Sequence, residues 1–476
     1  MLPYQKPEAW EDIDKILSRF SFWKNVYELW ESYLAQSGFP QFDRWLAQQL
    51  KRKKSFGKTD RYWYSEILFA GFRFGYLAAF LEHLQKSFLK KKGKTSALRW
   101  LTIPELEQAL ADFGSHYSDS SAIKRFWIEM KSEKFFQWIL LRYMVENSRD
   151  LEKNYQSISP SETSREIFLA LQKAITENTD LIHQMVWSGV PLWFKPFLEE
   201  RARQSNWDQE TVHRFLSRQG HRPPLWLRLN KLEKENEIRQ ELQAHGFRVF
   251  QQGRALMVEG SKGIYELEVY KKGYLEIQDL ASQLIGERVN PGSGEMIWDC
   301  CAGGGGKTLQ IAASIPASKG AVYASDIREY KLITLRQRAR RAQLFNIRTF
   351  RWDGNEAPIF GKEVQKRGGF HRVLVDAPCS SSGTWRRNPE ARFRFQLVEL
   401  AALMKLQLQL LQNASRTVIP KGQLIYATCS WLVDENEKVV ENFLHTNQNF
   451  QFISQEILGH PYQNSDTMFA AVLERK

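Results

Sequence analysis

Hydrophobic residues recur every three or four positions along the first 155 residues of the chain. One apolar stripe of this kind runs over residues 22–33 and another over residues 67–81. Such spacing places apolar side chains on one face of a helix. We therefore predict an all-helical domain over residues 1–155, in which the abundant Trp and Phe side chains form a core in preference to a surface for stacking bases.

The helical spacing is interrupted by a polar segment at residues 156–164 and resumes up to about residue 207. Short apolar runs at 225–229, 248–250 and 255–258 are typical of strands, and 231–245 has the pattern of a helix. We interpret residues 165–273 as a helical connector followed by a small α+β unit that binds RNA.

From about residue 274 onwards, short apolar runs alternate with helical segments. The runs at 296–299, 321–326 and 372–376 each end in an aspartate, and a further run at 424–427 leads into Cys429. Alternating strands and helices are typical of a parallel sheet with helical crossovers. We predict an α/β fold for residues 274–476, with its functional groups at the carboxyl ends of the strands.

Basic charge is concentrated in one segment of the chain. The whole sequence has a formal net charge of +13 and a pI near 9.4, and residues 51–100 alone carry a surplus of +10. Two lysine-rich runs, at 51–54 and 90–94, flank an aromatic-rich helical stretch. This pattern fits a surface whose lysines neutralise RNA phosphates. A solvated helix face with basic loops fits it equally well.

Cysteine usage and the N-terminus indicate the compartment. The chain has four cysteines, of which the first is Cys300, so no disulfide framework holds the first three hundred residues together. The N-terminus lacks a secretory pattern, and we find no apolar run near the roughly 18 to 20 residues that a membrane helix needs. We expect a cytoplasmic protein that does not bind a membrane.

A glycine-rich loop follows the run at 296–299 and leads into a helix. It comprises Cys301, Ala302, Gly303, Gly304, Gly305, Gly306, Lys307 and Thr308. Glycines here let the backbone approach a ligand closely, and the helix N-terminus adds hydrogen-bond donors. A Walker A loop would need glycine at the position of Cys301, so a P-loop NTPase is the weaker alternative.

Three acids follow the glycine loop in sequence order and indicate what it binds. Asp326 lies about twenty residues after the glycines, where doubly wound folds place an acid that binds ribose hydroxyls. Asp353 and Asp376 end the next two predicted strands. Taken singly, each acid also fits a solvated strand end or an ordinary turn. As an ordered series, they indicate an adenosine-type cofactor lying across the strand ends.

Two further cysteines end predicted strands in short motifs. Cys379 closes the sequence Asp-Ala-Pro-Cys at 376–379, and Cys429 lies in Ala-Thr-Cys-Ser at 427–430. A free cysteine is often only a small hydrophobic core residue. Two thiols at strand ends instead indicate covalent chemistry.

Together, these motifs resemble the Sun/Nop-type, RsmB-like RNA cytosine-5 methyltransferases. The agreement is strong over residues 274–476, weaker over 165–273, and only loose between residues 60–73 and a NusB-like RNA-binding domain. The matching segments, in order, are 274–282, 301–308, Asp326, Asp353, 376–380, 387–390, 426–430 and 469–475. Two segments depart from the family pattern: Gly303-Gly304 replaces Ala-Pro in the cofactor loop, and 465–469 replaces Asp-Gly-Phe-Phe.

The resemblance implies a fold, a cofactor and a set of residue roles. The fold is a class I Rossmann-like methyltransferase domain with a mostly parallel seven-stranded sheet. S-adenosylmethionine would bind the loop residues 301–307 together with Asp326, Asp353 and Asp376. Cys429 would attack carbon 6 of cytosine, Cys379 would assist release of the product, and Asp376 would bind the base near nitrogen 3.

The resemblance also implies an RNA partner, with ribosomal RNA favoured over transfer RNA. Lys307, Arg386, Arg387 and Asn388 would contact RNA, and Trp385, Arg392 and Arg394 would hold flanking nucleotides. We expect a monomer without a metal ion. Because the cofactor loop is altered and the N-terminal region is basic, a catalytically inactive RNA-binding ribosome-assembly factor is the alternative.

Overall fold

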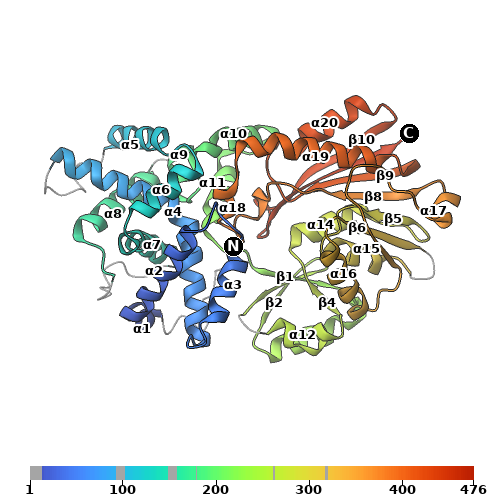
Figure 1. Cartoon of the computed structure of the whole chain (residues 1–476), viewed down its shortest axis with the longest axis horizontal. Helices are drawn as coiled ribbons and strands as arrows, with labels where there is room; N and C mark the ends of the chain where they lie inside the picture. Colours follow the sequence, from blue (N-terminus) through green and yellow to red (C-terminus); the bar gives the residue numbers. More distant parts are fainter. Residues whose placement is uncertain (1–12, 93–101, 148–157, 178–179, 261–262, 317–319) are drawn as a thin grey trace. The chain divides into compact units, whose positions relative to one another are not determined.

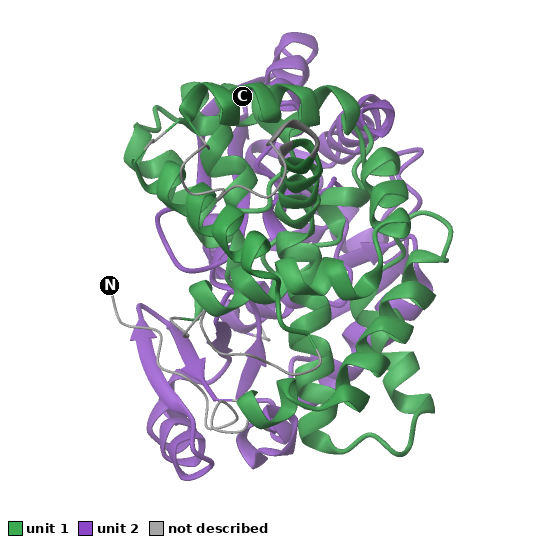
Figure 2. Cartoon of the chain, turned by 90° about the vertical axis from the view of Figure 1, so that its left-hand side faces the viewer, with its two compact units in different colours: residues 1–222, 385–396 green, residues 223–384, 397–476 purple. Residues whose placement is uncertain are grey.

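The chain folds into two compact units that do not follow the order of the sequence (Figure 2). Unit 1 comprises residues 1–222 and 385–396, and unit 2 comprises residues 223–384 and 397–476. The structure is a computed structural model that describes residues 13–92, 102–147, 158–177, 180–260, 263–316 and 320–476. Part of the basic run at 90–94 therefore lies outside the described residues.

Unit 1 is helical, as the spacing of its apolar residues predicts. Its helices are α1 (Ile13–Leu17), α2 (Phe20–Leu34), α3 (Phe42–Arg52), α4 (Lys58–Lys92), α5 (Ile103–His116), α6 (Ser120–Glu129), α7 (Ser132–Glu146), α8 (Glu162–Glu177), α9 (Leu181–Trp187), α10 (Lys195–Gln204), α11 (Gln209–Ser217) and α18 (Ala391–Arg394), with 3-10 turns η3 (Leu192–Phe194) and η4 (Arg218–Gly220). Local sequence sets the ends of several helices. At the start of α5, the Thr102 side chain accepts from the Glu105 N–H while Glu105 accepts from the Thr102 N–H.

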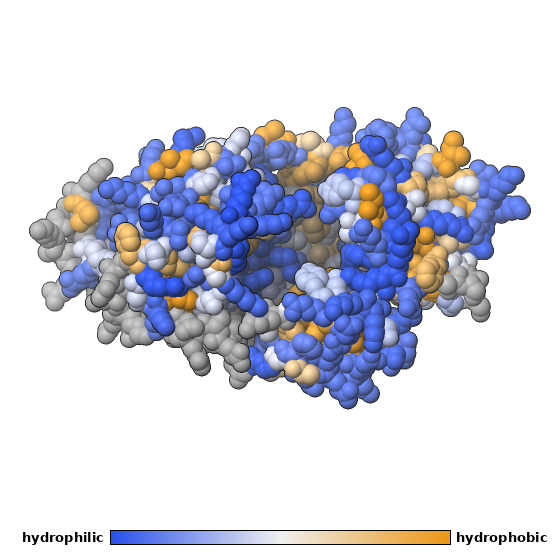
Figure 3. Space-filling model, turned by 60° about the horizontal axis from the view of Figure 1, so that its bottom comes forward, coloured by the Kyte–Doolittle hydropathy of each residue, from blue (hydrophilic) through white to orange (hydrophobic). Residues whose placement is uncertain are grey.

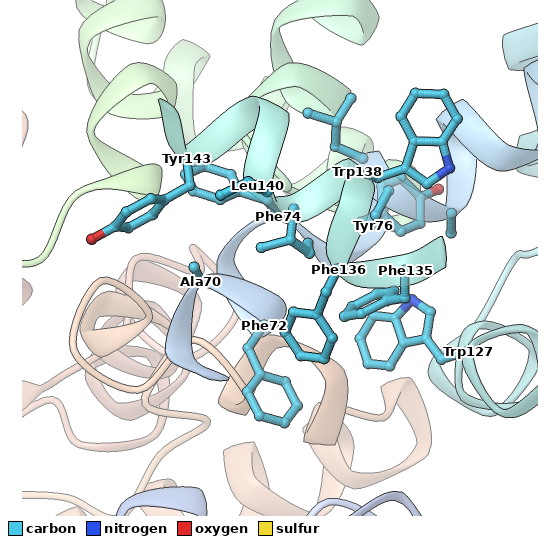
Figure 4. Packing of buried hydrophobic residues seen from close by; sticks show 14 of the residues in the cluster. Ala70, Phe72, Phe74, Tyr76, Trp127, Phe135, Phe136, Trp138, Leu140 and Tyr143 are labelled. Carbon is cyan, nitrogen blue, oxygen red and sulfur yellow. The ribbon is translucent and has the colours of Figure 1, made fainter. Parts of the chain in front are cut away.

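Aromatic side chains form the core of unit 1, as predicted (Figure 4). The rings of Trp30 and Phe135 stack with centroids 4.8 Å apart, and Phe72 packs against Trp30 at 4.9 Å. All three side chains are buried and so cannot stack on bases. The abundance of Trp and Phe is thereby explained by packing.

The expectation that the chain has no apolar run of membrane-spanning length is wrong for helix α4. Its segment Lys58–Ser87 is long and apolar enough by composition to cross a membrane, although we expected no such run. However, 89% of its most apolar window is buried inside the protein. A helix that is apolar on all sides is typical of the centre of a helical core, and we interpret α4 in this way.

Residues 385–396 belong to unit 1 although the strands on either side of them in sequence belong to unit 2. Phe393 is fully buried, with its ring edge-on to Trp127 at 4.8 Å. The guanidinium of Arg392 is also fully buried and donates to the backbone oxygens of Gly189 and Gln219. This insertion could not be predicted from local patterns, because the backbone partners of Arg392 lie 203 and 173 residues away in sequence.

Unit 2 contains two sheets and the helices that cover them. The small sheet consists of β1 (Leu225–Leu229), β2 (Arg248–Gln252), β3 (Ala255–Glu259) and β4 (Leu275–Ile277), and the large sheet of β5 (Met296–Asp299), β6 (Ala321–Asp326), β7 (Ile347–Arg351), β8 (Phe370–Asp376), β9 (Val418–Thr428), β10 (Phe450–Gly459) and β11 (Thr467–Arg475). The helices are α12 (Glu235–Ala244), α13 (Glu268–Lys271), α14 (Leu280–Val289), α15 (Gly306–Ser314), α16 (Glu329–Arg341), α17 (Lys362–Lys366), α19 (Leu397–Ser415) and α20 (Glu437–Thr446), with 3-10 turns η5 (Leu232–Lys234), η6 (Ile264–Glu266) and η7 (Ser382–Thr384).

The small sheet is antiparallel, with strand order β2-β3-β1-β4. Strands β1, β2 and β3 lie where the sequence predicts them. Strand β4 was not predicted, because three residues are too few to show an alternating pattern. Since β4 pairs with β1, the small sheet extends past the expected boundary at residue 274. The expected boundary near residue 160 also falls within unit 1.

The large sheet has strand order β10-β11-β9-β8-β5-β6-β7, and its strands are parallel except for β11. The predicted Rossmann-like α/β fold is thus confirmed. Successive residues of the central strands point to opposite faces. Trp298 and Val373 contribute to the core on the side of α19 and α20, whereas Ile297 and Leu374 pack on the side of α14 and α15 (Figure 1).

The face shown in Figure 3 is mostly hydrophilic, and its apolar residues form small separate groups. Isolated apolar side chains are normal on the surface of a folded protein. We infer no docking surface from this face.

Candidate active site

Four acids lie in a row at the carboxyl ends of neighbouring parallel strands. In the strand order β8-β5-β6-β7, Asp376, Asp299 and Asp326 end the first three strands, and Asp353 follows the fourth. The glycine loop leaves β5 in the middle of this row. The structure therefore brings together the three acids that the sequence singled out and adds Asp299 to them.

The two candidate cysteines lie beside this row. Strands β8 and β9 pair in parallel, with Asp376 opposite Ala427, so the turns after them start side by side. Cys379 Sγ and Cys429 Sγ lie 3.2 Å apart as free thiols, and both residues are partly exposed. Strand pairing alone thus explains why two motifs fifty residues apart meet.

The two thiols differ in their readiness to ionise. A hydrogen bond from Cys379 lowers the pKa of Cys429, helped by Ser381 and the cation of Lys307 and opposed by burial and Asp376. The same hydrogen bond raises the pKa of Cys379, together with burial and the charges of Cys429 and Glu435. Cys429 is therefore the thiol of the pair that loses its proton more readily.

Lys307, near the N-terminus of α15, is bound to the acid at the end of β8. Its Nζ lies 2.8 Å from Asp376 Oδ2, and its side chain is nearly buried. This ion pair connects the glycine loop to the cysteine-bearing turn. It also gives Lys307 a partner within the row of acids, whereas a Walker A lysine is directed at phosphate.

The glycine loop has the backbone conformation that its sequence requires. Gly303 and Gly305 have φ of +54° and +86°, in the left-handed region that favours glycine. Arg338 of α16 donates to the Gly304 carbonyl at 2.5 Å, and Arg228 of β1 donates to the Gly306 carbonyl at 2.6 Å. These two arginines hold a loop that lacks the family's proline.

The buried carboxylate of Glu276 fixes the orientation of Arg338. Glu276 is 1% exposed and accepts from Arg338 Nη2 at 2.9 Å and from Arg341 Nη2. Because Glu276 lies in β4, the small sheet supports the candidate cofactor loop. Sequence analysis missed this role, since the residues come from three distant segments.

Asp326 and Asp353 differ in their surroundings. Asp326 accepts a hydrogen bond from the Gly303 N–H at 3.0 Å and forms an ion pair with Arg328. Burial raises the pKa of Asp326, but these contacts outweigh it and lower the pKa below its usual value. Asp353 is exposed and accepts from the backbone and side chain of Asn355, within a turn where Gly354 has φ of +82°. Their predicted contacts with a cofactor stay predictions.

The segment expected to bind RNA is partly buried in unit 1. Arg386 is 2% exposed and donates to the backbone oxygens of Arg218 and His221, while Arg387 and Asn388 are partly exposed. RNA contacts by Arg387 and Asn388 stay predictions, whereas the side chain of Arg386 is too buried to reach RNA in this structure. For Trp385 and Arg392 the expectation is wrong, because both side chains are buried in unit 1 and cannot hold a nucleotide. Arg394 is exposed.

Three residues near the strand ends were missed by sequence reasoning. Asp299 is 1% exposed and accepts from Thr308 Oγ1 at 2.6 Å, and burial above all raises its pKa to about 7. Ser381 Oγ lies 3.5 Å from Cys429 Sγ, and Glu435 is bound to both cysteine-bearing turns. Asp299 could have been found from its place directly before the glycine loop, whereas the other two show no sequence signal of their own.

Over the described ranges, no group of three or more His, Cys, Asp or Glu side chains is placed to hold a metal ion.

One protein-family model matches the part of the chain that contains this site. The model described as "16S rRNA methyltransferase RsmB/F" matches residues 287–473, which contain the glycine loop, the acids and both cysteines. Residues 287–473 of this chain thus match the RsmB/F methyltransferase family. The resemblance inferred from the motifs is thereby confirmed.

Curated relatives agree with this match, and a solved structure shares the fold. "Ribosomal RNA small subunit methyltransferase B" of Erwinia tasmaniensis is 30% identical over 275 residues, covering 57% of this chain and 61% of the relative. The chain spans about three fifths of the length of the first curated relatives it matches. PH0851 shares the fold at a TM-score of 0.62 and 20% identity, covering 96% of this chain and 99% of its own.

A further solved structure shares the fold of the RsmB/F-type domain. NSun6 from Pyrococcus horikoshii, solved with the S-adenosylmethionine analogue SFG, has a TM-score of 0.50 at 16% identity, covering 59% of this chain and 98% of its own. S-adenosylmethionine is the cofactor of this methyltransferase family, as predicted. The site fits it, because a glycine loop and a row of acids at strand ends offer the donors and acceptors that an adenosine compound needs.

Proposed function

We propose that this protein is an S-adenosylmethionine-dependent RNA (cytosine-5)-methyltransferase that modifies ribosomal RNA. The observation that carries the proposal is the pair of thiols, Cys379 and Cys429, whose sulfur atoms lie 3.2 Å apart at the ends of β8 and β9. Methyl transfer to an oxygen or nitrogen needs no protein thiol. Carbon 5 of cytosine is a poor nucleophile, and a thiolate bonded to carbon 6 activates it.

The first step uses the more acidic thiol. The Cys429 thiolate adds to carbon 6 of the cytosine and forms a carbon–sulfur bond, while the electron pair of the carbon 5–carbon 6 double bond moves to carbon 5 and the ring. If bound by residues 301–307 and the row of acids, S-adenosylmethionine would supply an electrophilic methyl group to carbon 5 and would leave as the neutral thioether S-adenosylhomocysteine. Asp376 binds the base near nitrogen 3, and the Lys307 cation beside it stabilises the negative charge that develops on the ring.

The second thiol acts after this bond has formed. The hydrogen bond to Cys429 is the main cause of the high pKa of Cys379, and the Cys429 sulfur loses its negative charge in the adduct. Cys379 then loses its proton to solvent and takes the proton from carbon 5. The electron pair of that carbon–hydrogen bond restores the double bond, the carbon–sulfur bond breaks, and Cys429 leaves as a thiolate.

Ribosomal RNA is the substrate that the family description and the names of the relatives support. The net charge of +13 suits a polyanionic partner. A base within a helix has to leave its stack to reach the two thiols, which favours a loop or an incompletely folded region of RNA. We place this activity in the cytoplasm.

No observation favours the alternative of an inactive assembly factor. That alternative depended on an altered cofactor loop and on a basic N-terminal region. Arg338 and Arg228 hold the carbonyls of Gly304 and Gly306, and a basic region suits an RNA-binding enzyme equally well. Calorimetry with S-adenosylmethionine separates the two functions, because a chain that never binds the cofactor cannot be the enzyme.

The test of the proposed function is bisulfite mapping of cellular RNA with and without the gene. We expect a ribosomal RNA cytosine to lose its methyl group without the gene and to regain it with the wild-type protein, but not with Cys429→Ala. Cys300→Ala is the matched control and should restore methylation, because this thiol is buried away from the pair. A site in transfer RNA would contradict the substrate, and an unchanged map would contradict the function.

A further inference from the structure

A buried carboxylate outside the row of acids joins the two turns that carry the cysteines. Glu435 lies between β9 and α20 and is 0% exposed. Its Oε1 accepts from the Ser380 N–H at 2.8 Å, and its Oε2 accepts from Ser380 Oγ at 2.5 Å and Ser430 Oγ at 2.6 Å. Ser380 and Ser430 directly follow Cys379 and Cys429, so one side chain is bonded to both turns.

The backbone is held on both sides of Cys379. Gln407 of α19 donates from Nε2 to Glu435 Oε1 at 3.0 Å and also to the Pro378 carbonyl at 3.0 Å. Glu435 itself binds the N–H of Ser380. The residues before and after the thiol are therefore fixed to the same carboxylate and amide.

Glu435 also fixes the direction of the hydrogen bonds around Cys429. The Ser430 hydroxyl donates its one hydrogen to Glu435 Oε2, so its oxygen can only accept from other groups. Ser430 Oγ accepts from the Leu432 N–H at 3.1 Å and lies 2.8 Å from Ser382 Oγ, which accepts from the Trp431 N–H at 3.0 Å. The hydroxyl of Ser382 consequently donates to Ser430, and the chain of donors runs in one direction towards Glu435.

The four donors to Glu435 are neutral groups. Burial of a carboxylate is costly unless hydrogen bonds satisfy it, and hydrogen bonds to a charged group are the stronger ones. If a neutral amide replaced the Glu435 carboxylate, one of its two oxygens would become an NH2 group, and some of these four donors would lose their acceptor. The positions of both turns thus depend on the charge of this one residue.

We propose that Glu435 is a positioning residue that keeps the Cys379 and Cys429 thiols in contact by binding Ser380 and Ser430. This inference rests on the proposed function for its catalytic meaning, but the geometry of the thiols can be tested without RNA. Glu435 acts through its neighbours and does not itself need to reach the substrate.

The test compares Glu435→Gln with Glu295→Gln in the full-length protein. Glu295 is a matched control, because its carboxylate is also hydrogen-bonded, to Arg372 at 2.7 Å and to the Gly292 N–H at 2.8 Å, but at the opposite end of the strands. Each protein is treated with iodoacetamide at neutral pH, and mass spectrometry gives the rates of alkylation at Cys429 and Cys379. Single-turnover methylation of RNA and calorimetry with S-adenosylmethionine complete the set.

In the wild type and in Glu295→Gln, we expect Cys429 to be alkylated faster than Cys379. In Glu435→Gln, we expect the ratio of the two rates to fall towards one, and methylation to slow on the order of 10- to 100-fold, the scale for misplaced reacting groups. S-adenosylmethionine affinity should stay unchanged. A residue that only stabilised the fold would not change the ratio.

An unchanged ratio together with an unchanged methylation rate in Glu435→Gln would overturn the inference. If Glu435→Gln does not fold, Ser380→Ala takes its place, because it removes one donor to Glu435 and should shift the ratio in the same direction. If the wild type does not methylate RNA, the proposed function fails, while the alkylation ratio still decides the role of Glu435.

Discussion

At the residue scale, burial and nearby charges separate the pKa values of neighbouring groups at the strand ends. Cys429 has a lowered pKa and Cys379 a raised one, and both effects follow from a single hydrogen bond between them. The pKa of Asp299, which lies two strands away from Cys429, is raised to about 7, chiefly by burial. Groups of the same type thereby differ in how readily they ionise.

The raised pKa of Asp299 predicts a specific pH dependence of stability. An unfolded Asp ionises near pH 4, whereas folded Asp299 keeps its proton up to about pH 7. The stabilising contribution of this group is therefore complete below pH 4 and is lost as the pH rises to about 7. Asp299→Asn keeps an acceptor for Thr308 and removes the titration.

We expect the unfolding free energy of Asp299→Asn, relative to the wild type, to rise by up to roughly 1.4 kcal/mol for each pH unit between 4 and 7. Urea unfolding at a series of pH values measures this difference, with Asp353→Asn as an exposed control. A difference that stays constant with pH would contradict the raised pKa.

The sequence predicted residues whose function follows from their place on a strand. Cys379, Cys429 and Asp376 end or follow apolar runs, and parallel pairing of those runs brought them together. Glu435 and Gln407 were not predicted, because their importance arises only from contacts with distant turns. Trp385 and Arg392 were misassigned, since an exposed loop and a buried insertion look alike in sequence.

At the scale of elements, the glycine loop combines freedom of conformation with external support. Gly305 needs glycine, because φ is +86° and an added Cβ would lie 2.6 Å from Leu335 Cγ. Gly304 does not, because its φ is not in the left-handed region and its Cβ would meet only the end of Arg338 at 3.4 Å. The two positions should respond to alanine in opposite directions.

We expect Gly304→Ala to raise the unfolding free energy by about 0.4–1 kcal/mol, because alanine restricts the unfolded chain more than glycine does. Gly305→Ala should lower it by about 1–3 kcal/mol through strain and overpacking. Gly305→Ala should also weaken binding of S-adenosylmethionine. Denaturant unfolding and calorimetry measure these effects, and equal effects of the two variants would contradict the loop geometry.

Strands and helices with four or more patterned residues were largely predicted. The seven strands of the large sheet form the mostly parallel sheet that the family resemblance implies, whereas β4 was not predicted because it has only three residues. Its pairing with β1 depends on register, which no local pattern reveals.

At the scale of the whole molecule, the turn that carries Cys379 continues into a segment that belongs to unit 1. Residues 385–396 contribute Phe393 and Arg392 to the interior of that unit. The helical unit is therefore incomplete without a segment encoded in the middle of the methyltransferase region. Division of the chain at residue 222 would separate the helices from part of their own core.

Phe393→Ala in the full-length chain tests this arrangement. Loss of a fully buried Phe costs about 3–5 kcal/mol, and the affected partners are Trp127 at 4.8 Å and Phe39 at 5.8 Å. We expect hydrogen exchange to accelerate in α6 and near Phe39 in unit 1. Arg394→Ala, an exposed neighbour, should change little. Unchanged exchange in unit 1 would contradict the assignment of this segment.

The central claim is that the two thiols have separate and sequential roles. It is tested most directly by denaturing electrophoresis of the protein incubated with S-adenosylmethionine and the ribosomal RNA that the wild type methylates. We predict that Cys379→Ala accumulates a covalent protein–RNA species, because Cys429 attacks but release fails, and that Cys379→Ala with Cys429→Ala forms none. A covalent species that persists in the double variant, or that is absent from Cys379→Ala, would contradict the account.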